Sequence, residues 1–121
     1  MPIPAEIKKE GNIHTILDSI REDLLVLPDK ITGCSDGNAA HMAISIPTLL
    51  SDLAWYELAA SRRGVTYEIL DTMSKCIDYD MSTLSKIRDC KNLLNIEHDI
   101  DRIMGNYAFL QGFFKDLKCN S

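Results

Sequence analysis

Three residues between positions 34 and 41 have the types that nucleophilic catalysis requires. Cys34 lies in a glycine-containing segment, Asp36 follows it, and His41 is near enough in the sequence to serve as a base. A helix start would stabilise a thiolate, and an acid can orient a histidine base. The spacing matches no nucleophile signature, however, and a partly buried loop cysteine explains Cys34 as well. We therefore predict that the protein is not an enzyme.

Metal ligation is the second chemistry that the residue types suggest. A two-metal carboxylate site in a helical bundle needs Glu-x-x-His on facing helices. The residues three positions before the histidines are Gly11, Asn38 and Asn95. Residues 97–99 (Glu-His-Asp) have ligand types, but acids also favour the positive end of a helix dipole. No P-loop, GxSxG or dinucleotide motif occurs, so we expect neither metal nor cofactor.

The overall charge argues against two classes of binding partner. The chain has 121 residues, a net charge of −5 and a pI near 5.0. Nucleic acids and anionic membranes both attract basic surfaces, so we expect neither as a partner. With 45% apolar and 26% charged residues, the composition is that of a globular domain.

The apolar runs and the cysteines bear on location. No apolar run approaches the roughly 18 residues that span a bilayer, and residues 1–11 have no signal-like apolar region. The cysteines (Cys34, Cys76, Cys90 and Cys119) are dispersed, without a CxxC pair. We expect reduced thiols and a cytoplasmic protein.

The elements that must position any site are helices. Apolar residues recur at alternating steps of four and three near the C-terminal end: Ile96, Ile100, Ile103, Tyr107, Leu110, Phe114 and Leu117. This heptad stripe predicts a helix capped by Asn95 and reaching about Lys118, packed against other helices.

Shorter stripes predict helices over residues 12–26, 37–45, 48–63, 65–79 and 82–94, with Pro28 ending the first and Ser82 capping the last of these. Residues 1–11 are expected to be a flexible polar arm. No segment alternates with a period of two. The prediction is therefore all-α: one domain over 1–121, a single compact bundle of five to six helices with no sheet.

A partner surface is suggested by apolar residues outside these stripes. Phe109 and Phe113 project away from the heptad stripe, and Gly112, which has no side chain, would let a partner approach that side closely. Trp55 points away from the stripe of its own helix. Burial of the last helix in the centre of its own bundle would explain the two phenylalanines equally well. The predicted partner-binding residues are Phe109, Phe113, Gly112, Trp55, Glu97, Asp99 and Asp101.

Residues 65–94 also have the pattern of a helix–turn–helix motif. A helix starting near Ser82 would carry polar and basic side chains able to touch phosphates and base edges. Under this alternative the DNA-binding residues are Ser82, Thr83, Lys86, Arg88 and Lys91. A mixed-charge exposed face explains them as well, because acids and bases are nearly balanced there.

Taken together, the residues favour a small acidic helical protein that acts without catalysis by binding another protein. An inhibitor or neutraliser of the immunity-protein or antitoxin type, or a small phage- or plasmid-type regulator, fits this size and charge. Acidic side chains would steer a basic toxin or nuclease, and aromatic side chains would anchor it. A homodimer is also compatible with this size and charge. The alternative is a helix–turn–helix transcriptional regulator.

Overall fold

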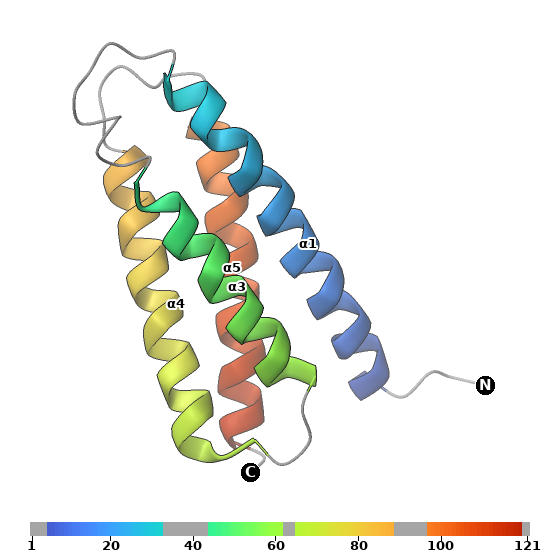
Figure 1. Ribbon diagram of the computed structural model, residues 1–121. Coiled ribbons are helices and arrows are strands. Elements are labelled where there is room, and N and C mark those ends of the chain that lie inside the picture. Colours follow the sequence, from blue (N-terminus) through green and yellow to red (C-terminus); the bar gives the residue numbers. More distant parts are fainter. Residues whose placement is uncertain (1–4, 33–43, 62–64, 89–96, 120–121) are drawn as a thin grey trace.

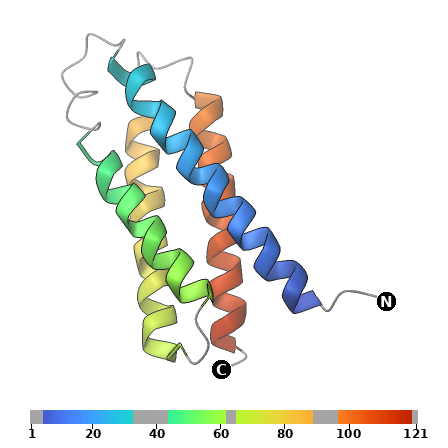
Figure 2. The ribbon, with the colours of Figure 1, turned by 45° about the vertical axis from the view of Figure 1, so that its right-hand side comes forward.

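The computed structural model describes residues 5–32, 44–61, 65–88 and 97–119. These residues form four α-helices: α1 (Ala5–Thr32), α3 (Ile46–Ser61), α4 (Tyr67–Arg88) and α5 (Glu97–Cys119). The helices run alternately up and down, and each packs against its two neighbours, so that α1 contacts α3 and α5, and α4 contacts the same two helices (Figure 1). The N-terminal end of α1 diverges from the other three (Figure 2). The all-α class is thus confirmed, and the described residues contain no strand.

The core is formed largely by the apolar stripes predicted from the sequence, with Leu27 and Ile46 added beyond the predicted helix ends. Within α5 the five central stripe residues, from Ile100 to Phe114, are fully buried, and Leu117 is partly buried. The stripes of α1 and α3 are buried opposite them. Their fully or almost fully buried members are Ile13, Leu17, Ile20, Leu24, Leu27, Ile46, Leu49, Leu53 and Tyr56. A helix that repeats apolar residues every three to four positions presents one such face to its neighbours.

The first helix is longer than predicted at both ends. It begins at Ala5, so residues 5–11 are helical rather than part of an arm, and it continues through Pro28 to Thr32. A proline removes one backbone hydrogen bond from a helix interior. Here tertiary contacts flank that position, because Leu27 is buried and the Lys30 ammonium lies 2.6 Å from Asp99 of α5. The local penalty is offset by packing that the sequence pattern alone does not show.

The two helices predicted over 65–79 and 82–94 are one continuous helix up to Arg88. Ser82 does not cap a new helix, and the Thr83 hydroxyl donates a hydrogen bond to the carbonyl of Tyr79 inside α4. An unbroken heptad stripe explains the continuity; its members are Leu70, Met73, Ile77, Asp80, Leu84 and Ile87. The predicted helix over 37–45 lies mainly, and the Asn95 cap entirely, outside the described residues. The described residues therefore form four helices, where five to six were predicted for the chain.

None of the described helices combines the length and the apolar character that crossing a membrane requires.

Candidate functional site

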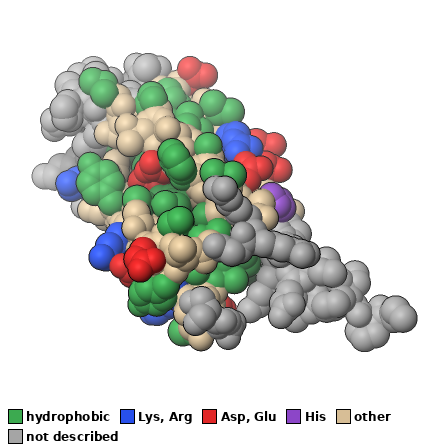
Figure 3. Space-filling model, turned by 60° about the horizontal axis from the view of Figure 1, so that its bottom comes forward, with side chains coloured by type: hydrophobic (Ala, Val, Ile, Leu, Met, Phe, Trp, Pro, Cys, Tyr) green, Lys and Arg blue, Asp and Glu red, His purple; other side chains and the backbone are tan. Residues whose placement is uncertain are grey.

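The most exposed apolar surface of α3 lies beside a hollow between α3 and α4. Trp55 is 60% exposed and Leu58 is 50% exposed. Both line the hollow together with Ala59, Val65, Ile69 and Met73. Its volume of about 90 Å³ is far below the roughly 300–1,000 Å³ of small-molecule sites. This surface suits contact with another side chain better than enclosure of a ligand. Figure 3 shows hydrophobic side chains exposed in several places on the lower face.

The predicted surface of α5 is only partly exposed. Phe109 is 47% exposed and lines a second hollow with Gly112, Phe113 and Asp116. Phe113 itself is only 8% exposed, and its ring packs edge-on against Phe114 with the centroids 5.6 Å apart. The alternative of a core position therefore describes Phe113, whereas Phe109 has the exposure of a contact residue. Trp55 and Phe109 belong to separate hollows, so the structure does not bring the predicted aromatic anchors together.

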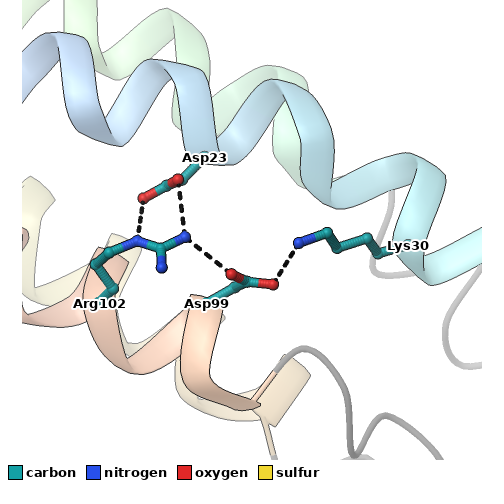
Figure 4. A network of polar contacts seen from close by, with 4 residues as sticks. All are labelled: Asp23, Lys30, Asp99 and Arg102. Carbon is teal, nitrogen blue, oxygen red and sulfur yellow. Dashed lines mark hydrogen bonds and ion pairs between the residues drawn. The ribbon is translucent and has the colours of Figure 1, made fainter.

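The three predicted acidic contact residues are engaged within the bundle. Asp99 accepts hydrogen bonds from Lys30 at 2.6 Å and from Arg102 at 2.8 Å, and Arg102 also binds both carboxylate oxygens of Asp23 on α1 (Figure 4). These cations hold the pKa of Asp99 below its usual range, chiefly through the hydrogen bond from Lys30.

On the α4 side, the Arg88 Nε lies 3.3 Å from Asp101 and 3.9 Å from Glu97. All three acids at the start of α5 thus join helices of the same chain. Their charge is partly neutralised, which weakens their predicted role in steering a basic partner.

The residues of the DNA-binding alternative lack the expected motif. Ser82, Thr83, Lys86 and Arg88 lie in the last two turns of α4, and Lys91 lies outside the described residues. A helix–turn–helix needs a turn before the recognition helix, and α4 has none between Tyr67 and Arg88. Arg88 is also paired with acids of α5. The alternative therefore loses the geometry on which it was based.

A buried polar cluster between α3, α4 and α5 was missed by the sequence analysis. Asp80 is fully buried, and its Oδ2 accepts a 2.5 Å hydrogen bond from the hydroxyl of Tyr56. Its Oδ1 and the hydroxyl of the fully buried Tyr107 have no hydrogen-bond partner among the described residues. The sequence contains a signal for this cluster, because the acid Asp80 takes a heptad position between Ile77 and Leu84. The predicted helix break at Ser82 obscured it.

Burial and charge shift the titration of this cluster. Burial, together with the neighbouring carboxyl of Asp52, raises the pKa of Asp80 to about 8. Burial also raises the pKa of Tyr56, and next in effect is its hydrogen bond to Asp80. The pKa of the Cys76 thiol is raised by burial and by the charges of Asp52 and Asp80. A thiol with a raised pKa is a poor nucleophile at neutral pH.

The other candidate chemistry is not assembled in the part of the chain that the structure describes. No group of three or more histidine, cysteine or acidic side chains there could hold a metal ion. Cys76 and Cys119 are free thiols. Cys34, Asp36, His41 and Cys90 lie outside the described residues.

Comparison with known proteins yields no relative: no family model matches the chain, and neither a curated protein nor a solved structure does.

Proposed function

We propose that this protein acts without catalysis, by binding another protein through the α3–α4 surface around Trp55. The observation that carries the proposal is the exposure of Trp55 and Leu58 beside a hollow lined by Val65, Ile69 and Met73. Tryptophan is among the commonest residues at the energetic centre of an interface. A neighbouring apolar hollow can receive a side chain of a partner.

The charge of this face supports a protein as the occupant. The exposed residues of α3 are uncharged: Pro47, Thr48, Ser51, Ala54, Trp55, Leu58 and Ser61. Its two acids lie elsewhere, since Glu57 binds Arg21 of α1 at 3.0 Å and Asp52 faces Asp80 of α4. Charged residues are depleted at the centres of protein interfaces, whereas a nucleic acid or an anionic membrane would need basic side chains.

Within this class we propose an inhibitor or neutraliser in the cytoplasm, of the immunity-protein or antitoxin type. The net charge of −5 favours a basic partner such as a toxin or nuclease. The acids at the start of α5 add less to this than the sequence implies, because they are paired within the bundle. Trp55 and Leu58 replace Phe113 as the proposed anchors, and Phe109 offers a second contact point.

Affinity capture from the source cell with three variants tests the proposal. A true partner should be captured by the wild type and by Glu22→Ala on α1, but at least tenfold less by Trp55→Asp and Leu58→Asp, since an anchor contributes about 2 kcal/mol or more. All variants should melt within a few degrees of the wild type because the three side chains are exposed. A partner captured equally by all four chains would remove this surface from consideration. Inhibition of the purified partner's activity by the chain then tests the neutraliser role.

A further inference from the structure

The interface between α3 and α4 is the smallest of the four interfaces between neighbouring helices, and the buried carboxyl of Asp80 links these two helices. Ion pairs connect α1 to α3, α1 to α5 and α4 to α5. The contact between α3 and α4 is bridged instead by the hydrogen bond from the Tyr56 hydroxyl to Asp80 Oδ2. Both side chains are fully buried. The attachment of α3 to α4 therefore includes, besides apolar packing, a polar contact that water does not screen.

The groups that face Asp80 are acids or weak acids from three helices. They are Asp52 and Tyr56 on α3 and Tyr107 on α5, with Cys76 on α4 itself. The Tyr56 hydroxyl is the group that stabilises the charged form of Asp80, and Oδ1 has no partner among the described residues. A negative charge on Asp80 would thus be buried, half-satisfied and close to the carboxylate of Asp52, which is an expensive arrangement.

We propose that Asp80 is a proton-controlled latch: α3 stays on α4 while Asp80 is protonated, and repulsion between its buried carboxylate and that of Asp52 releases α3 when the proton is lost. The released helix carries Asp52 away from Asp80, which relieves the repulsion between the two carboxylates. Helix α3 is the shortest of the four, at 16 residues, and needs the fewest contacts broken. The inference goes beyond the proposed function, because the latch requires no partner.

The direction of the pH effect follows from the two states of Asp80. In the released or unfolded chain its carboxyl is ionised above about pH 4. In the closed bundle its raised pKa of about 8 keeps it protonated. The closed state binds one more proton between these values, so its stability falls as the pH rises from about 4 to 8 and is constant above. One proton corresponds to a tenfold change in the equilibrium constant per pH unit at most.

Hydrogen exchange measured residue by residue between pH 5 and 8 tests the latch. After correction for intrinsic exchange rates, protection of the α3 amides should fall by up to tenfold per pH unit, and protection of the α5 amides should fall less. Asp80→Asn keeps an acceptor for Tyr56 but cannot ionise. Protection of the α3 amides in this variant should therefore not show the fall with pH that Asp80 causes in the wild type. Asp78→Asn, an exposed position on the same helix, should keep it. Any pH dependence that comes from other groups is present in both proteins and cancels in this comparison.

A carbon-13 NMR titration of the wild-type carboxyl groups provides a measurement that needs no variant to fold. Asp80 should titrate several pH units above an exposed aspartate. Titration near pH 4 would overturn the latch. So would a pH slope that survives in Asp80→Asn, or a loss of protection that is equal in α3 and α5, since that result indicates unfolding of the whole bundle.

Discussion

Arg102 of α5 holds Asp23 of α1 with two hydrogen bonds of 3.0 Å each, although the two residues are 79 positions apart. The same guanidinium reaches Asp99, which in turn binds Lys30 of α1. This network ties the outer edges of α1 and α5 above the buried stripe of Ile100 and Ile103. A bidentate pair fixes the relative position of two helices as well as attracting them.

Arg102→Ala should lower the free energy of unfolding by no more than about 1 kcal/mol. The side chain is 55% exposed, so solvent and salt screen much of the attraction. Arg102→Lys should recover part of the loss, since it keeps the charge but not the paired geometry. Urea denaturation at low and high salt measures this. Lys115→Ala on the same helix serves as the charge control, and an equal loss there would show that the network adds nothing.

Leu110→Ala should cost about 2–5 kcal/mol of stability, because Leu110 is fully buried in the middle of the α5 stripe and leaves a cavity. Leu25→Ala removes the same atoms from a side chain that is 59% exposed, and should change stability by about 0.5 kcal/mol or less. Thermal and chemical unfolding of the pair give the comparison. Similar losses in both variants would place the core on the wrong face of these helices.

Phe113→Asp should destabilise the isolated chain by about 3 kcal/mol or more, since it buries an unpaired carboxylate against Phe114. Helix geometry alone left open whether Phe113 is an interface anchor or a core residue, and its burial favours the core. Phe109→Asp should cost about 1 kcal/mol or less because Phe109 is half exposed. Melting temperatures distinguish the two, and equal tolerance would show that Phe113 is not part of the core.

A double-mutant cycle at pH 6 should reveal strong coupling between Tyr56 and Asp80. Tyr56→Phe leaves the Asp80 carboxyl without its donor, and Asp80→Leu leaves the Tyr56 hydroxyl without its acceptor, at a cost of about 1–3 kcal/mol each. The double variant removes both polar groups, and the space of the lost hydroxyl helps to admit leucine. Its loss should be smaller than the sum of the single losses. Additive losses would mean that the hydrogen bond contributes little.

Gly112→Ala should stabilise the isolated chain by roughly 0.5–1 kcal/mol, because alanine restricts the unfolded chain and favours the helix. The added methyl group would meet no atom within 4 Å. Gly105→Ala, which also opens onto free space, should act in the same direction. Denaturation curves check both. A loss of stability in either variant would contradict the open space that the structure shows around these two glycines.

The positions of α3 and α5 and most of the core could be predicted from the sequence, because apolar spacing near 3.6 residues is a local property. The heptad stripe from Ile100 to Phe114 is buried as predicted, and Pro47 lies in the first turn of α3. The break at Ser82 and the stop at Pro28 were wrong, since capping and proline signals are weak when packing on both sides favours a continuous helix. The site was only partly predictable: Trp55 was placed outside the apolar stripe of its helix, but the two phenylalanines could not be told apart.

The sequence by itself determined the class of the fold, through stripes that can be buried only against other helices. Tertiary structure decided which charged residues are paired and which polar residue is buried. Asp99 and Arg102 meet partners some seventy positions or more away on α1, and Asp80 meets Tyr56 of α3 in the core. Such contacts depend on how helices are placed side by side, and a local periodicity contains no information about the neighbouring helix. The free energy of a charge likewise depends on its surroundings in space, so the same residue type is a surface acid at Asp78 and a buried acid at Asp80.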